Sequence, residues 1–204
     1  MHKARFEGFS EGVFAFAFTL LALGFVVPHA AHISDPQLAR SLLSQWPNLI
    51  SYALSVAVIG IMWHNHQALF RMVARIDRVT VFWNLLLLGG TAFIPFATNA
   101  LGSYPSYRAS TFLYGLVLTY CATAYNLMLN HLVAARLFQP EIGAQAVAQT
   151  VRAYRTGWVG YAVSMLLALW MPLAAFAAYV GIALYYLVPH GLDTDSVSGG
   201  GQAV

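Results

Sequence analysis

The sequence predicts an all-α integral membrane protein with six transmembrane helices. Three observations support this prediction: 59% of the 204 residues are hydrophobic, only 8% are charged, and the apolar residues gather in stretches about as long as a bilayer span. A soluble domain usually carries about 25% charged residues, so this chain cannot cover a water-exposed surface. The mean hydropathy of +0.65 agrees. We expect the chain to lie within the lipid bilayer.

The apolar stretches define the expected spans, because a helix needs about 20 mostly apolar residues to cross a bilayer. The first four spans lie near residues 9–27, 49–70, 79–101 and 110–137. The last apolar tract, residues 158–188, would be roughly 45 Å long as one helix, whereas the hydrocarbon core is about 30 Å thick. Pro172 lacks a backbone donor and disfavours continuation of a helix. We therefore expect two further spans, 150–171 and 172–188.

These spans form one expected transmembrane domain, residues 1–189. The polar, glycine- and serine-rich residues 190–204 have the composition of a disordered tail. We expect the first apolar segment to be retained as a span, because no convincing small-residue cleavage site follows it.

The basic residues predict the orientation, because cytoplasmic flanks of membrane spans are enriched in lysine and arginine. Eight of the ten fall on one side of the six-span layout: Lys3, Arg5, Arg71, Arg75, Arg78, Arg136, Arg152 and Arg155. Arg40 and Arg108 fall on the other side. Both termini are then cytoplasmic, in a multi-pass protein of the cell (inner) membrane. A five-span layout would place the tail outside without conflicting with any of these residues.

The short basic segments form no patch suited to nucleic acid, so we expect no nucleic-acid partner. A single cysteine, Cys121, excludes an intrachain disulfide, a zinc cluster or a CxxC redox pair.

Polar residues lead directly into the first span. Arg5, Ser10 and Glu11 precede or enter a long apolar run, and Arg5 and Phe9 stand one helical turn apart. Ionisable groups at membrane depth persist mainly where they pair or line a water-filled path. Either this segment is an interfacial helix end, with Arg5 reaching the headgroups and Glu11 capping the helix, or it is a buried network that holds this helix against its neighbours.

The second and third spans supply possible partners for that network. Trp63, His66 and Phe70 share one helical face by their spacing, and Asn84 lies early in the third span. His66 could exchange hydrogen bonds with Ser10 or Glu11. A serine–glutamate–histidine set also occurs in hydrolases, but no nucleophile elbow or oxyanion-hole element accompanies it here. A metal site is disfavoured as well, because His64 and His66 diverge on a helix. We expect no enzymatic activity and no cofactor.

An apolar stripe follows on the first span: Phe16, Leu20 and Leu23, with Thr19 beside them. In an ordinary bundle such a stripe packs or contacts lipid. If several copies surround a symmetry axis, rings of these side chains can instead form a constriction that gates ions by dewetting. The residues 156–162, Thr-Gly-Trp-Val-Gly-Tyr-Ala, only superficially match a potassium-channel selectivity filter, because the final glycine and a pore helix are absent.

Several short motifs in spans one to three form a set that can be compared with known families. The segment Arg5-x-x-x-Phe9-Ser10-Glu11-Gly12 resembles the signature Arg-x-x-x-Phe-Ser-Asp that opens span one in the transmembrane protein 175 family of potassium channels. Further matches are Val13-Phe14-Ala15, Thr19-Leu20-Leu21, Trp63-x-x-His66, Asn84-Leu85-Leu86-Leu87-Leu88 and Pro95-Phe96. The match covers spans one to three.

The resemblance implies a potassium-permeable channel without a conventional filter or re-entrant pore loop. It implies a homotetramer of single six-span units, with span one lining the pore, a constriction at Phe16, further pore positions at Leu20 and Leu23, and a pore-adjacent Thr19. Arg5, Phe9, Ser10, Glu11, Trp63, His66 and Asn84 would then hold the pore helix rather than touch potassium ions.

The sequence departs from the family pattern at two positions. Glu11 replaces the signature aspartate, and Phe16 stands where isoleucine or leucine is usual, so the narrowest ring falls at Phe16 or one turn later at Leu20. Two other functions remain open from the residues alone. One is a proton-coupled secondary transporter that uses Glu11 and His66 as a relay, and the other is a membrane scaffold without transport.

Overall fold

The computed structural model describes residues 3–26 and 34–187, and within these ranges the chain is helical, with no strand. The elements are α1 (Lys3–Leu20), the 3-10 helix η1 (Leu21–Gly24), α2 (Asp35–Leu43), α3 (Trp46–Met72), α4 (Arg78–Ser103), α5 (Arg108–Ala134), α6 (Ala144–Leu167) and α7 (Pro172–Leu187). The predicted all-α class is confirmed. The expected tail, residues 190–204, lies outside the described residues.

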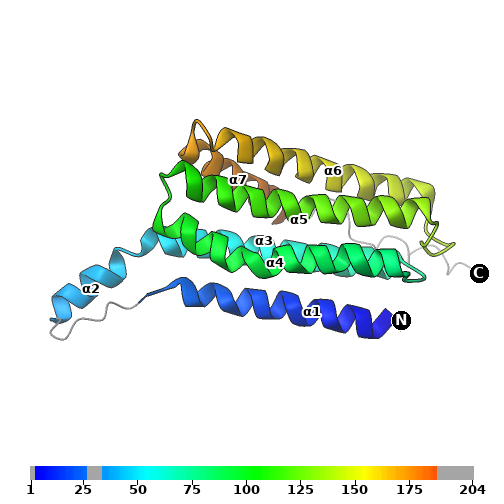
Figure 1. Cartoon of the computed structure of the whole chain (residues 1–204), viewed down its shortest axis with the longest axis horizontal. Helices are drawn as coiled ribbons and strands as arrows, with labels where there is room; N and C mark the ends of the chain where they lie inside the picture. Colours follow the sequence, from blue (N-terminus) through cyan, green and yellow to red (C-terminus); the bar gives the residue numbers. More distant parts are fainter. Residues whose placement is uncertain (1–2, 27–33, 188–204) are drawn as a thin grey trace, which may run out of the picture.

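The six long helices run side by side in an elongated bundle (Figure 1). α1 lies along one edge and contacts α4 and α3, whereas α5 packs against α4, α6 and α7. The start of α1, the α3–α4 connection and the α5–α6 connection all lie at the same end (Figure 1). We call this the basic end, because most of the lysine and arginine residues flank it. The α4–α5 and α6–α7 connections lie at the opposite end.

Helix boundaries follow local chemistry. α6 stops at Leu167 and α7 starts at Pro172, which suits proline because the first helical turn needs no backbone donor there. Two expected boundaries need correction. α5 ends at Ala134 rather than at 137, because Arg136 adopts a positive φ of 52° that breaks the helix. α6 begins at Ala144, six residues before the expected position 150.

The short helix α2 was not expected from the sequence. Ser34 and Gln37 form a capping box at its start, and Pro36 lies in its first turn. None of its residues is buried. Figure 1 shows it projecting from the end of the bundle opposite the basic end. A nine-residue helix is too short to leave a span-length apolar signal, which is why the search for membrane spans overlooked it.

Four helical segments are long and apolar enough to cross a membrane: Lys3–Gly24, Trp46–Met72, Arg78–Ser103 and Arg108–Ala134. α7 is apolar but has only 16 residues, about 24 Å of helix. α6 has 24 residues, and Arg152 and Arg155 lower its hydropathy. The protein is therefore a helical membrane protein with at least four membrane-crossing candidates in its described part.

The centre of the bundle is built around α4 and α5. Side chains of both helices are fully buried, including Leu87, Ile94, Tyr114 and Met128. Three hydroxyl groups also meet in this interior: Ser55 of α3 bonds to Thr98 of α4 at 2.7 Å and to Tyr114 at 2.9 Å. These three hydroxyl groups form a polar cluster that joins α3, α4 and α5 without involving α1.

Candidate functional site

The two faces of α1 differ sharply. Its inner face packs into the bundle and consists of the buried Phe6, Ser10, Phe14 and Ala17, spaced by three or four residues. Its outer face carries large apolar side chains that the protomer leaves mostly exposed, such as Phe16, which is 65% exposed. One side of this helix is therefore fixed, while the other is free to meet lipid, a second copy or a pore.

A buried chain of three polar side chains fixes the inner face. The Asn84 amide of α4 donates to the Ser10 hydroxyl at 2.9 Å, and the Ser10 hydroxyl donates to the Phe6 carbonyl at 3.0 Å. His66 Nε2 of α3 lies 2.9 Å from the Asn84 carbonyl oxygen. An amide oxygen only accepts, so His66 carries its proton on Nε2. The three side chains are at most 2% exposed, and they join α1, α3 and α4.

Aromatic rings enclose the imidazole of His66. Phe6 lies at 6.3 Å between ring centroids, Phe14 at 5.4 Å, Phe70 at 4.6 Å and Tyr125 at 6.4 Å. Offset and edge-on ring contacts of this kind stabilise packing beyond their buried area. The enclosure keeps water from competing for the hydrogen bonds of the network. This favours a holding role for His66 rather than proton exchange with bulk water.

The other expected network residues lie elsewhere. Arg5, Phe9 and Glu11 are exposed, and Glu11 accepts a hydrogen bond from Gln67 at 3.0 Å rather than from His66. Trp63 is 42% exposed although its spacing places it on the side of His66. The protomer thus brings together Ser10, Asn84 and His66 and leaves the rest of the signature on the surface.

The expected pore stripe lies along the outer face of α1. Phe16 and Leu20 line a groove of about 530 Å³ between α1 and Ala92 of α4. The Thr19 hydroxyl donates to the Phe16 carbonyl at 2.8 Å. The expectation of one α-helix over residues 9–27 needs correction, because α1 ends at Leu20 and Leu23 lies in the 3-10 turn η1, 73% exposed. Residue 27 is outside the described ranges.

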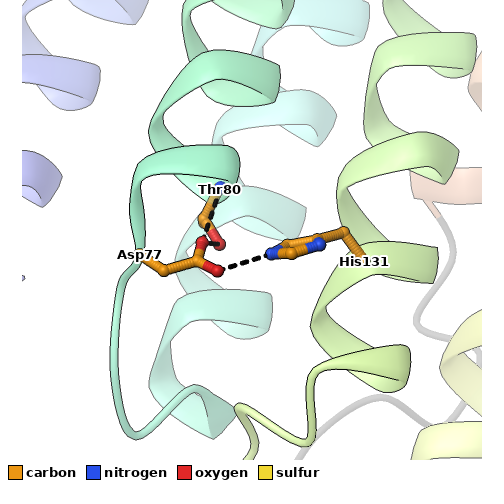
Figure 2. A network of polar contacts seen from close by, with 3 residues as sticks. All are labelled: Asp77, Thr80 and His131. Atoms are coloured by element: carbon orange, nitrogen blue, oxygen red, sulfur yellow. Dashed lines mark hydrogen bonds and ion pairs between the residues drawn. The ribbon is translucent and has the colours of Figure 1, made fainter.

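A second polar site, which the sequence analysis missed, lies at the basic end (Figure 2). Asp77 precedes α4 and accepts hydrogen bonds from the Thr80 amide at 2.8 Å and the Thr80 hydroxyl at 2.7 Å. His131 Nε2, in the last turn of α5, lies 2.7 Å from the other carboxylate oxygen of Asp77. An aspartate three residues before a threonine, just ahead of an apolar run, is a recognisable helix cap. Its pairing with a histidine 54 residues later has no sequence signal.

The environment of Asp77 keeps it ionised. Partial desolvation raises the pKa of its carboxyl, but the Thr80 hydrogen bonds and the contact with His131 outweigh this and lower the pKa from 3.8 to about 2. The N-terminus of α4 also favours negative charge at this position. Asp77 is therefore a carboxylate at every physiological pH.

The described residues contain no group of three or more histidine, cysteine, aspartate or glutamate side chains that could hold a metal ion. The carboxylates and imidazoles occur singly or in pairs, such as Asp77 with His131. Cys121 is buried in α5. The site that the fold presents is thus a helix with one fixed and one open face.

An apolar helical bundle with such an edge helix is a helical membrane protein, and comparison with known proteins identifies its family. The model of the endosomal/lysosomal potassium channel TMEM175 family matches residues 5–95. A potassium channel of Streptomyces collinus is 38% identical over 189 residues, which cover 90% of this chain and 91% of that protein. The chain belongs to the TMEM175 family, and the resemblance inferred from its motifs is confirmed.

Two further relatives show how far the likeness extends. The crystal structure of a lysosomal potassium-selective channel TMEM175 homolog from Chamaesiphon minutus matches with a TM-score of 0.81 and 32% identity, covering 91% of this chain and 96% of that one. The endosomal/lysosomal proton channel TMEM175 of Gallus gallus is 32% identical over 103 residues, 48% of this chain but only 21% of that protein. The relatives from Streptomyces collinus and Chamaesiphon minutus therefore match in length as well as in sequence.

Proposed function

We propose that this protein is a potassium channel, selective for potassium or at least preferring it among monovalent cations, with a pore lined by α1 from each of four identical subunits. The observation that carries the proposal is the division of α1 into a fixed inner face and an open apolar outer face. Relatives matched over nearly their whole length are named potassium channels. Transport is passive, down the electrochemical gradient.

The proposed constriction consists of apolar rings at Phe16, Leu20 and Leu23, with Thr19 beside them. Four copies of a bulky ring around an axis leave little room for water, so the pore closes by dewetting and opens when the rings separate. Phe16 supports this assignment because it lies in the α-helical part of α1 and is 65% exposed in the protomer. Leu23, in the 3-10 turn, lies one turn beyond Leu20.

The network of Ser10, Asn84 and His66 positions α1 in this proposal. Its hydrogen bonds tie α1 to α3 and α4, so that the outer face of α1 points away from the bundle. Arg5, Phe9, Glu11 and Trp63 are exposed in one protomer, which leaves them available for contacts between subunits.

The proposed topology has six spans in the cell (inner) membrane, with the basic end in the cytoplasm. Eight of the ten lysine and arginine residues belong to this side, which matches the positive-inside rule. α6 and α7 complete the six spans. The described part of α7, Pro172–Leu187, accounts for about 24 Å of its span.

Recording from purified protein in planar bilayers tests the proposal. With potassium on one side and sodium on the other, we expect single-channel currents whose reversal potential lies toward the potassium equilibrium potential. Phe16→Ala should raise leak, because a methyl group replaces the ring. Phe18→Ala is the matched control, because Phe18 is also exposed on α1 but lies two residues, about 200° of helix, away.

Three outcomes would contradict parts of this proposal. Unchanged flux in Phe16→Ala would remove Phe16 from the pore. Saturable uptake that requires a pH gradient, without single-channel currents, would favour a proton-coupled transporter over a channel. A correctly reconstituted tetramer that passes neither potassium nor protons would favour a scaffold.

A further inference from the structure

The connection between α3 and α4 is attached to several parts of the molecule at the basic end. Lys3 Nζ, at the start of α1, donates to the Val73 carbonyl at 2.7 Å. The Ala74 amide donates to the Leu137 carbonyl at 2.8 Å, so the connection also pairs with the segment after α5. The Gln139 amide extends this pairing by donating to the Met72 carbonyl at 2.9 Å. α1 is therefore attached to residues that lie only four positions before Asp77.

Asp77 and His131 form the remaining attachment of this connection. Asp77 stands at the N-terminus of α4 and His131 in the last turn of α5, so each helix dipole favours the charged form of its residue. The side chains are 39% and 22% exposed, so protons from the aqueous phase reach the pair. Figure 2 shows the imidazole directed at the carboxylate across the gap between the two helices.

Other charged and titratable groups occur on the connections and helices near the C-terminal part of α5. They are Arg75 in the α3–α4 connection, Arg78 on α4, Arg136 and Glu141 after α5, Arg152 and Arg155 on α6, and Tyr185 and Tyr186 on α7. Within residues 3–26 and 34–187, His131 forms its ion pair with Asp77, while Lys3 pairs with Glu7 at 3.9 Å. Asp77 is thus the carboxylate that responds to the charge on His131.

We propose that Asp77 and His131 are positioning residues for the pore helix, and that protonation of His131 from the cytoplasmic side strengthens their contact and holds the start of α1 through Val73 and Lys3. The proposal deepens the proposed channel function and rests on it. Histidine is the side chain that ordinarily changes its charge between about pH 5 and 8. A charge-assisted hydrogen bond is roughly twice as strong as a neutral one.

The direction of the effect follows from the charges. Asp77 stays ionised over this range, because its pKa is lowered to about 2, so the strength of the contact depends on whether the imidazole of His131 carries a charge. At acidic cytoplasmic pH the pair is ionic, the connection is held, and the four α1 helices keep their rings together. At alkaline pH only a neutral hydrogen bond remains, the start of α1 is less restrained, and the pore passes more current.

Currents recorded at cytoplasmic pH 5.5 and pH 8 test this proposal. For the unmodified channel we expect the potassium current to be about twofold to fivefold larger at pH 8. His131→Gln keeps a neutral donor and should give the larger current at both pH values. His131→Lys keeps a permanent positive charge and should give the smaller current at both. His64→Gln is the matched control, since His64 is an exposed histidine of α3, and it should keep the full pH response.

If His131 had only a structural role, His131→Gln would not give a large current and His131→Lys a small one, each independent of pH. A full pH response in His131→Gln, or a potassium current equal at pH 5.5 and pH 8 in the unmodified channel, would overturn the proposal. Absence of potassium current at any pH would instead contradict the proposed function.

A second measurement does not depend on conduction. Hydrogen exchange of the Ala74 and Gln139 amides reports whether the connection stays paired. At pH 8 these amides should exchange about twofold to fivefold faster in the unmodified protein than in His131→Lys, and at pH 5.5 the two proteins should be equal. Equal exchange at both pH values would overturn the proposal.

Discussion

α1 and α5 are both apolar helices of one bundle, yet they are packed in different ways. In the most apolar stretch of α5, 50% of the residues are buried, whereas 28% are buried in the corresponding stretch of the segment that contains α1. Glycines show the same contrast. A Cβ atom added at Gly115 of α5 would lie 2.0 Å from the Tyr179 hydroxyl, but one added at Gly8 or Gly12 of α1 would meet nothing within 4 Å.

This difference shows which helix is free to contact something outside the protomer. α5 satisfies its packing within the chain, so its sequence is constrained by neighbours on most sides. α1 satisfies only its inner face, through Ser10 and the rings around His66. Small residues on an open helix face permit close approach of another helix in a membrane, as Gly8 and Gly12 would allow. The contrast therefore supports α1, rather than α5, as the element at the proposed tetramer axis.

The largest expected effect comes from removing the amide that joins α1 to the bundle. Asn84→Leu leaves the His66 imidazole without its partner and removes the donor to the Ser10 hydroxyl, which keeps its bond to the Phe6 carbonyl. Each buried group that loses its partner costs about 1–3 kcal/mol. We expect a lower free energy of unfolding in mixed micelles and a loss of potassium selectivity, because α1 is no longer fixed to α4.

A matched variant separates this effect from loss of volume. Asn99→Leu changes the same residue type on the same helix, at an exposed position outside the network. It should unfold within about 0.5 kcal/mol of the unmodified protein, the usual range for surface substitutions. If Asn84→Leu and Asn99→Leu were equally stable, the network would not hold α1. The inner face of α1 would then not be fixed as proposed.

A smaller effect is expected at the tight contact between α4 and α5. A Cβ atom at Gly90 would lie 2.6 Å from the Tyr120 ring and 2.7 Å from Cys121 Sγ, whereas the adjacent Gly89 has open space. Overpacking costs about 1–3 kcal/mol, of which up to about 1 kcal/mol is returned by the better helix propensity of alanine. We expect Gly90→Ala to lower the thermal stability of the protein in detergent.

Gly89→Ala is the internal control for this prediction. It gains the helix propensity without the clash, so its stability should be equal or slightly higher. Loss of stability in Gly89→Ala that appears only in the tetramer would indicate a subunit contact on that face of α4. Equal effects of the two substitutions would show that α4 and α5 are less tightly packed than their glycines indicate.

The sequence predicts the fold well because a membrane span is recognised by its hydropathy, which is summed over consecutive residues and does not depend on tertiary contacts. Apolar length located α1, α3, α4 and α5, and Pro172 located the break before α7. The boundaries at Ala134 and Ala144 were missed because they depend on a backbone turn at Arg136 and on packing, not on hydropathy. α2 was missed because its signal is a capping box at Ser34, which a search for long apolar stretches passes over.

The site is only partly predictable for a different reason. Helical spacing and family motifs indicated Ser10, His66 and Asn84, and these three meet in the structure. They did not show that Asn84 stands between the other two or that Glu11 turns to Gln67. The pair of Asp77 and His131 could not be found at all, because which helices lie side by side is decided by tertiary packing.

The smallest expected effect tests the polar cluster that does not involve α1. Ser55→Ala removes one hydroxyl that bonds to Thr98 and Tyr114. Hydrogen bonds between membrane helices are worth about 0.6 kcal/mol on average, and Thr98 keeps its bond to the Ile94 carbonyl. We expect a loss of about 0.5–1 kcal/mol in the free energy of unfolding and unchanged potassium selectivity. A loss of selectivity as large as that in Asn84→Leu would mean that the whole bundle, and not the fixed face of α1, determines the pore.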